Sequence, residues 1–145
     1  MILVTGGAGY IGCVLVAELL GKGESVRLYD KLYFGDTGLS RYREKVELVQ
    51  GDLRYFDPKV LEGIDAIIHL AGLSNDPTAE FNPKANHEMN TVATGILAKA
   101  CKGKGIKRFT FASTCSIYDR GLFAEDARVD LPRGAVALGL ESLSP

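Results

Sequence analysis

The feature that most constrains this chain is a glycine-rich segment that starts at Thr5 and reads Thr-Gly-Gly-Ala-Gly-Tyr-Ile-Gly. It follows the apolar residues 2–4 and opens an amphipathic stretch, so it is expected to join a strand to a helix. Without a Cβ, Gly6 can turn sharply, Gly9 lets a phosphate approach the backbone, and Gly12 lets the helix pack on the strand. N–H groups at the start of the helix attract phosphate. The segment predicts a dinucleotide site.

The spacing of these glycines is Gly-x-x-Gly-x-x-Gly, and not the Gly-x-Gly-x-x-Gly of simpler dinucleotide folds. A glycine motif alone is weak, and the alternative interpretation is a glycine-rich turn with no ligand. Here the strand, loop, helix and second strand follow in the order that such a site requires, which favours the dinucleotide site.

Asp30 ends the second apolar segment of the chain. A carboxylate at this point can accept hydrogen bonds from both hydroxyls of an adenosine ribose, and it repels a 2′-phosphate. Asp30 therefore favours NAD over NADP. Arg27 and Lys31 flank it and leave NADP open as an alternative, and a solvated charge at a strand end is the other alternative.

Short apolar segments alternate with longer amphipathic ones along the chain. The expected strands are residues 2–4, 25–29, 46–49, 66–70 and 109–111. This alternation predicts the α/β class, with a Rossmann-type doubly wound parallel sheet of which the chain holds the N-terminal five-strand portion. The pattern fades after Tyr118. We therefore expect residues 1–130 to form an NAD-binding domain, residues 131–145 to form an atypical or disordered tail, and the substrate domain to be absent.

Two amphipathic stretches predict helices, over residues 10–20 and 82–104. An apolar stripe identifies the first, formed by Ile11, Val14, Leu15 and Leu19. The second begins with Asn82 as N-cap before Pro83 and is closed by Gly105. The crossovers at 36–44 and 58–62 are short.

The charge of the chain is nearly balanced, with 17 Lys and Arg against 18 Asp and Glu. This balance predicts neither a nucleic-acid partner nor a membrane surface. Met1 is not followed by the charged start of a secretory signal, and three cysteines without CxxC spacing predict no disulfide framework and no zinc site. A cytoplasmic location and no metal site are expected.

The two histidines and one cysteine have ordinary interpretations. His69 lies in an apolar strand and is expected to be a buried, hydrogen-bonded histidine, and His87 is expected to be solvated. Cys115 has no base near it in the sequence, so a nucleophilic role is disfavoured.

Five segments in order resemble the extended short-chain dehydrogenase/reductase family, in its NAD-dependent epimerase/dehydratase group acting on nucleotide sugars. They are the glycine loop 5–12, Gly-Asp-Leu-Arg at 51–54, His-Leu-Ala-Gly at 69–72, Asn90 within Met-Asn-Thr-Val, and the stretch 111–118 after the fifth strand. The resemblance covers most of the chain. It identifies the family and no single member.

The resemblance assigns roles to particular residues. Asp52 meets the adenine amine, the backbone of Leu53 meets the adenine ring, and Asn90 steadies the active site. Thr114 is the catalytic hydroxyl that donates a hydrogen bond to the substrate, with Ser113 beside it. The cofactor-binding residues implied in this way are Gly6, Gly9, Tyr10, Ile11, Gly12, Asp30, Asp52, Leu53, Leu70, Ala71, Gly72, Asn90 and Ser113.

The function implied by the resemblance is NAD-dependent epimerisation or dehydration, by hydride transfer at a sugar carbon. A full-length relative would bind a nucleotide sugar, and a homodimer could form through the helix at residues 82–104. Asp119 stands where the family has glycine after Tyr118, a departure expected to change only the loop.

The family's Tyr-x-x-x-Lys pair is missing from its expected place. The tyrosine acts as a base because a neighbouring ammonium lowers its pKa. The one such string, Tyr55 to Lys59, contains a proline and precedes the fourth strand, so we interpret it as a chance match. In the tail, Leu138 and Ser142 stand where the pair would align, and no Tyr or Lys follows Tyr118.

This departure leads to a hypothesis and two alternatives. The hypothesis is that the chain is a C-terminally truncated or frameshifted family member. The alternatives are a non-catalytic NAD-binding module, and a fragment without its own function.

Overall fold

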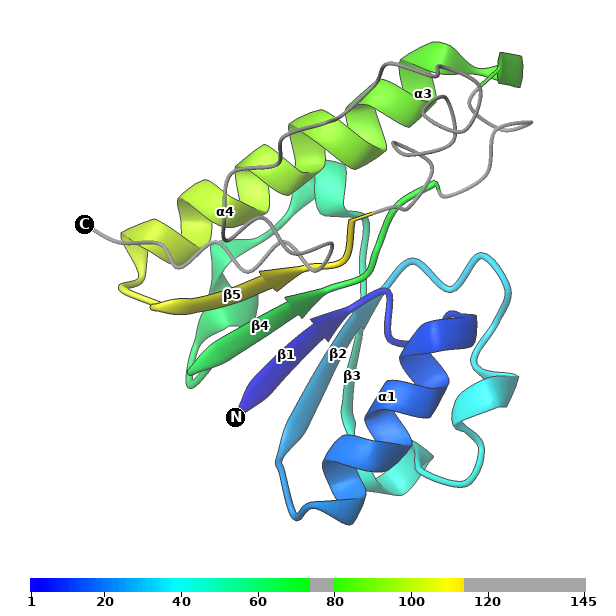
Figure 1. The fold of residues 1–145 in the computed structure, drawn as a ribbon, viewed down its shortest axis with the longest axis vertical. Coiled ribbons are helices and arrows are strands. Elements are labelled where there is room, and N and C mark those ends of the chain that lie inside the picture. The colour runs from blue at the N-terminus through cyan, green and yellow to red at the C-terminus, as the bar shows by residue number, and fades with distance from the viewer. Residues whose placement is uncertain (74–79, 114–145) are drawn as a thin grey trace, which may run out of the picture.

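The computed structural model describes residues 1–73 and 80–113 of the chain. Five parallel strands form one sheet in the order β3-β2-β1-β4-β5 (Figure 1). The strands are β1 (Ile2–Thr5), β2 (Val26–Asp30), β3 (Glu47–Gln50), β4 (Ala66–His69) and β5 (Arg108–Phe111). The predicted five-strand doubly wound sheet is confirmed.

Side chains of the central strand β1 alternate between two apolar cores. Leu3 packs in one core with Ile67 and Leu97, and the next residue, Val4, packs in the other with Leu28. Such alternation follows from the two-residue period of a strand. Both faces of the sheet are therefore covered, which explains why the strand segments read as continuous apolar runs.

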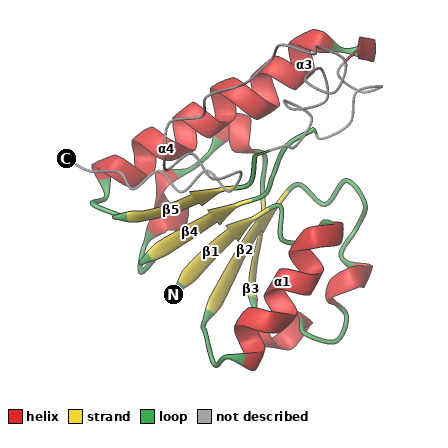
Figure 2. Ribbon diagram, in the orientation of Figure 1, coloured by secondary structure: helices red, strands yellow, loops and turns green. Residues whose placement is uncertain are grey.

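Helices cover the two faces separately (Figure 2). On one face lies α1 (Tyr10–Gly21). On the other lie α3 (Pro83–His87), a π-helical turn (Glu88–Val92) and α4 (Ala93–Gly103), in direct succession. Both predicted helices are confirmed in position, although the π turn was not expected.

The capping predictions for the second helix hold. The Asn82 side chain accepts a hydrogen bond from the Ala85 N–H at 3.0 Å, and Gly105 follows α4 with a φ of 71°. Both are ordinary devices for starting and ending a helix.

The predicted apolar stripe of α1 is partly wrong. Ile11 is 67% exposed and Val14 is 63% exposed, whereas Gly12 and Val16 are buried. The helix face that contains Gly12 packs against the turn after β1. Ile11 and Val14 therefore point toward solvent, although the apolar periodicity predicted that they would be buried.

Short 3-10 turns replace helices in two of the crossovers, as their weak patterns predict. The crossover from β2 to β3 holds η1 (Thr37–Leu39) and η2 (Arg43–Lys45). That from β3 to β4 holds η3 (Leu53–Tyr55) and η4 (Pro58–Leu61). No helix in the described ranges is long and apolar enough to cross a membrane.

Candidate functional site

The turn after β1 is closed by glycines that tolerate no side chain. Gly6 has a φ of 74°, and a Cβ there would lie 2.6 Å from the Ala71 backbone nitrogen. A Cβ on Gly12 would lie 2.4 Å from the Gly6 carbonyl oxygen. Since real Cβ contacts of this kind are much longer, only glycine permits this close meeting of the turn, α1 and the end of β4.

The start of α1 is left open toward solvent. Gly9 is the N-cap and supplies no side-chain hydrogen bond, and the first turn contains no acid. Tyr10 is 93% exposed beside it. Within residues 1–73 and 80–113, no side chain caps this helix N-terminus, so it presents backbone N–H groups and partial positive charge, and a pyrophosphate fits these properties.

Asp30 lies at the carboxyl end of β2 and faces this turn. Its Oδ2 accepts a hydrogen bond from the Ala8 N–H at 3.0 Å, and its Oδ1 accepts one from the Leu32 N–H at 2.8 Å. A carboxylate has about four acceptor positions, so two remain for ribose hydroxyls. Leu32 has a φ of 59°, a left-handed conformation that costs about 1–2 kcal/mol and redirects the chain after Asp30.

A second carboxylate, Asp52, lies just after β3, and two cationic side chains bind it. Lys31 Nζ lies 2.7 Å from Asp52 Oδ2, and Arg54 Nη2 lies 2.6 Å from the same oxygen. Oδ1 accepts from the Arg54 N–H and Nε–H, both at 3.0 Å. Hydrogen bonds from Arg54 hold the pKa of Asp52 well below its usual range, and the hydrogen bond to Asp52 raises the pKa of Lys31.

Arg27 cannot serve as a cation for an NADP phosphate. Its Nη1 donates to the carbonyl oxygens of Val60 and Glu62 at 2.7 and 2.8 Å, and its Nη2 pairs with Glu47 at 2.9 Å. These partners lie near the amino end of β2, three residues before Asp30, which is about 10 Å along a strand. The expectation that Arg27 flanks the ribose site is therefore wrong, and Lys31 alone of the two lies at the correct end.

His69 is a buried structural residue, as predicted. Its Nδ1 lies 2.5 Å from Thr5 Oγ1 and its Nε2 lies 2.9 Å from Thr94 Oγ1, so the ring joins β1, β4 and α4. Burial lowers its pKa to about 4. The neutral ring is thus the folded form, and both nitrogens have partners.

Asn90 lies on the π turn and forms hydrogen bonds with the backbone of the segment after β4. Its Oδ1 accepts from the Leu73 N–H at 2.7 Å, and its Nδ2 donates to the Leu73 carbonyl at 2.8 Å. A Cβ on Gly72 would come within 2.8 Å of Asn90 Oδ1. The asparagine therefore positions the backbone directly after the His-Leu-Ala-Gly motif.

The predicted cofactor residues gather mostly at one edge. The carboxyl ends of the strands bring together the glycine turn, Asp30, Asp52 and the segment Leu70 to Gly72, because the strands are parallel and in register. Leu53 is 3% exposed within η3, and Ser113 is exposed just after β5.

Other sequence predictions fall away from this edge or outside the described residues. Tyr55 and Lys59 lie on separate 3-10 turns, η3 and η4, and share no helix face, in agreement with a chance match. Thr114, Leu138 and Ser142 lie outside the described residues, as do Cys115 and the tail.

The sequence reasoning missed the cation pair around Asp52. Arg54 also lies 3.6 Å from Glu88 of the π turn, which links the end of β3 to the element that carries Asn90. The only signal in the sequence was the charge pattern Asp30-Lys31 and Asp52-Leu53-Arg54, which gives no pairing by itself.

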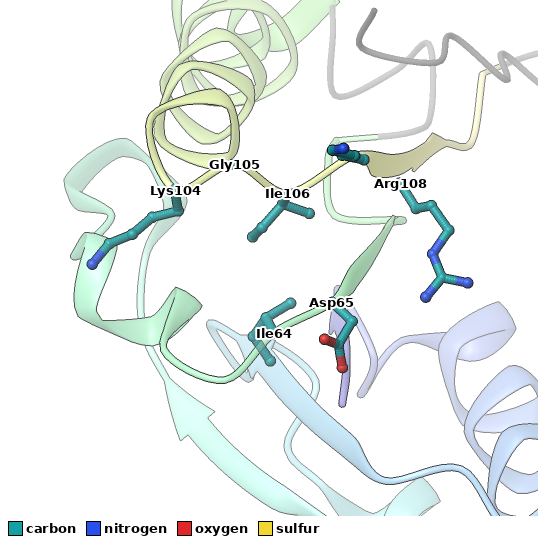
Figure 3. A pocket seen from close by; sticks show the side chains of 7 residues that line it. Ile64, Asp65, Lys104, Gly105, Ile106 and Arg108 are labelled. Carbon is teal, nitrogen blue, oxygen red and sulfur yellow. The ribbon is translucent and has the colours of Figure 1, made fainter.

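A solvent-open pocket lies at the opposite edge of the sheet, and it is not this site. Figure 3 shows Ile64 and Asp65 on one side and Lys104, Ile106 and Arg108 on the other. These residues lie just before β4 and at the start of β5, so the pocket faces away from the glycine turn. Ligands of doubly wound sheets bind at the carboxyl ends of strands.

The NAD dependent epimerase/dehydratase family matches residues 2–132 of the chain. The chain belongs to this family. Its glycine turn and parallel sheet are those that the family resemblance predicted, so the family and fold predictions are confirmed.

Relatives of the family show how much of a longer protein the chain matches. It is 36% identical over 121 residues to a UDP-glucose 4-epimerase of Lacticaseibacillus casei, covering 81% of this chain and 36% of the relative. It is 32% identical over 159 residues to UDP-glucose 4-epimerase 3 of Oryza sativa subsp. japonica, covering 97% of this chain and 43% of the relative. The chain thus spans less than half the length of these epimerases.

Solved structures of the family share the fold. MoeE5 in complex with UDP-glucuronic acid and NAD has a TM-score of 0.71 and 33% identity, with coverage of 81% of this chain and 38% of that one. The UDP-N-acetylglucosamine 4-epimerase from Methanobrevibacter ruminantium M1 in complex with UDP-N-acetylmuramic acid has a TM-score of 0.77 and 29% identity, with coverage of 92% and 42%.

Proposed function

We propose that this chain is the NAD-binding part of a nucleotide-sugar epimerase or dehydratase, with residues 1–130 as the binding domain and 131–145 apart from it. The observation that carries the proposal is the cradle formed by Gly6, Gly9 and Gly12 at the uncapped start of α1, with Asp30 facing it. This arrangement matches a pyrophosphate followed by an adenosine ribose.

Each part of the edge has a role in this proposal. NAD, when bound, would supply an acceptor for a hydride from a sugar carbon. The N–H groups of α1 bind the pyrophosphate, and the two open acceptor positions of Asp30 bind the ribose hydroxyls. Asn90 holds the backbone at Leu73, so that Leu70, Ala71 and Gly72 form a fixed wall. Ser113 and Thr114 follow β5, and Thr114 orients the sugar by donating a hydrogen bond.

The proposed substrate class is a UDP-sugar, because MoeE5 is in complex with UDP-glucuronic acid and the Methanobrevibacter epimerase with UDP-N-acetylmuramic acid. A cytoplasmic location belongs to the same proposal. So does a homodimer through residues 82–104, which carry the 44% exposed Val92. Sedimentation of the purified chain at two concentrations tests the dimer.

Calorimetric titration with NAD tests the proposed binding. We expect saturable heat with a 1:1 stoichiometry. A folded sample, with the circular dichroism of an α/β protein, that gives no saturable heat would refute the proposal. A coupled assay with UDP-glucose and UDP-galactose then tests turnover separately.

A second candidate is an NAD-binding module without turnover. It is favoured by one observation: Leu138 and Ser142 stand where the family's Tyr-x-x-x-Lys pair would align. Without that pair, no phenol of lowered pKa is available to take the proton as hydride leaves. Saturable NAD binding with no epimerisation of UDP-glucose supports this candidate, and measurable epimerisation excludes it.

A further inference from the structure

Lys31 follows Asp30, the proposed ribose-binding carboxylate, in the sequence, but its ammonium is bound to other side chains. Consecutive Cα atoms are about 3.8 Å apart, so Lys31 begins beside Asp30 at the end of β2. Its ammonium does not remain there. It lies 2.7 Å from Asp52 Oδ2 and 2.7 Å from the Tyr33 hydroxyl oxygen. The contact with Asp52 joins the segments that follow the neighbouring strands β2 and β3.

Asp52 has no unused acceptor position for a further donor. Its two oxygens are contacted by four donor groups, which are the Arg54 N–H, Nε–H (shared between both oxygens) and Nη2, and the Lys31 ammonium. A carboxylate offers about four lone-pair positions, so these contacts fill it. The carboxylate therefore serves as an anchor for cations in this structure, and an adenine amine could bind it only by sharing with them.

This anchoring decides which charge faces a nucleotide bound at the ribose position. Asp30 carries one negative charge there, with both oxygens bound by the N–H groups of Ala8 and Leu32. The Lys31 ammonium is ion-paired with Asp52 instead. A 2′-hydroxyl would meet an acceptor, whereas a 2′-phosphate would meet a carboxylate with no available cation.

We propose that Asp52 is a specificity-determining residue that maintains the preference for NAD over NADP by holding Lys31 away from the ribose 2′ position. The inference rests on the proposed NAD site, and it gives a second carboxylate a part in the selection of NAD over NADP. Asp30 repels the phosphate directly, and Asp52 acts through Lys31 as a positioning residue.

The inference predicts a gain of binding, which damage to the fold cannot imitate. In Asp52→Asn the amide binds an ammonium more weakly than the carboxylate does. Lys31 is then released toward the 2′ position, while Arg54 keeps its partner Glu88 at 3.6 Å. A charge-assisted contact between ammonium and phosphate is about twice as strong as a neutral one. We expect the ratio Kd(NADP)/Kd(NAD) to fall about tenfold.

The experiment is calorimetric titration of the purified chain with NAD and with NADP, for wild type, Asp52→Asn, Lys31→Gln and the double variant. In the double variant the ratio Kd(NADP)/Kd(NAD) should return to within about twofold of wild type, because the released cation is gone. Lys31→Gln alone should leave the ratio at or above the wild-type value.

Asp36→Asn is the matched control, because it removes one carboxylate from the loop that carries Lys31 without releasing Lys31. Asp36 pairs with Arg43 at 3.6 Å and is half exposed. An unchanged ratio in Asp52→Asn, an equal fall in Asp36→Asn, or a fall that persists in the double variant would each overturn the inference while NAD binding stands. If folded wild type binds no NAD, the proposed function fails and the inference fails with it.

Discussion

At the scale of single residues, glycine is required in the turn after β1 because a Cβ at these positions would collide with backbone atoms. Backbone cannot move aside as a flexible side chain can. The would-be Cβ of Gly12 meets the Gly6 oxygen at 2.4 Å, whereas that of Gly21, in the same helix, meets nothing within 4 Å. The two glycines therefore provide a direct test of what the turn requires.

Gly12→Ala should abolish saturable NAD binding and destabilise the fold by about 1–3 kcal/mol, because the methyl group forces the turn from α1. Gly21→Ala should keep NAD affinity within twofold and change the free energy of unfolding by less than about 1 kcal/mol. Urea unfolding and calorimetry measure both. Equal behaviour of the two variants would contradict the assigned role of the turn.

His69 should make the stability of the protein depend on pH. Its pKa is about 4 when folded and 6.5 when unfolded, so the unfolded chain binds more protons between these values. Its contribution is complete above pH 6.5 and is lost as pH falls toward 4. The total loss is roughly 3 kcal/mol, from about 1.36 kcal/mol per pKa unit.

Urea unfolding between pH 7 and 4 measures this slope. His69→Gln should remove that part of the slope, and His87→Gln, at an exposed position, should leave it unchanged. The assignment is wrong if the His69 variant keeps the wild-type pH dependence.

At the scale of elements, the π turn between α3 and α4 carries the side chain that holds the end of β4. π turns inside helices often occur at functional sites. Here the turn places Asn90 against Leu73, with a further hydrogen bond from Asn90 Nδ2 to Asn86 Oδ1 at 3.1 Å. The helix thereby positions a backbone segment at the carboxyl edge of the sheet.

Asn90→Ala should reduce the free energy of unfolding by about 1–3 kcal/mol, because the Leu73 N–H and carbonyl lose their partners. It should also accelerate amide exchange at Leu73 and weaken NAD binding. Asn86→Ala removes one hydrogen bond and spares those two, so its effect should stay below about 1 kcal/mol. Comparable exchange at Leu73 in both variants would show that the π turn does not hold this segment.

At the scale of the whole molecule, a ligand that bridges the ends of β1, β2 and β4 should stabilise the folded chain. At NAD concentrations about 100 times Kd, mass action adds roughly 2.7 kcal/mol. For a domain of this size that corresponds to a rise in Tm of roughly 5–10 °C.

Differential scanning fluorimetry with NAD and NADP checks this expectation. NAD should raise Tm, and NADP at the same concentration should raise it less. Asp30→Asn should reduce the NAD effect, since one ribose partner loses its charge. An equal rise with NADP in wild type would contradict the assigned preference.

Local features of the chain determined much of this molecule. Strand limits agree with the apolar runs to within one or two residues, because β-branched segments bounded by polar ones have little alternative once both sheet faces are covered. The Asn82 cap was equally predictable, since it acts on a neighbour in the sequence. The glycine loop and Asp30 were predictable as parts of a strand-loop-helix pattern, although their contacts with Ala71 and Ala8 join segments distant in sequence.

Tertiary structure decided which residues meet across the sheet. Three features depend on segments distant in sequence. They are the orientation of α1, the hydrogen bond of Arg27 to Val60 near the amino end of β2, and the ion pair of Lys31 with Asp52. Side-chain charges can pair with any partner within reach, and only the register of the strands determines which partner that is. Hydrophobic periodicity and motif spacing in the sequence therefore do not predict which charged side chains pair.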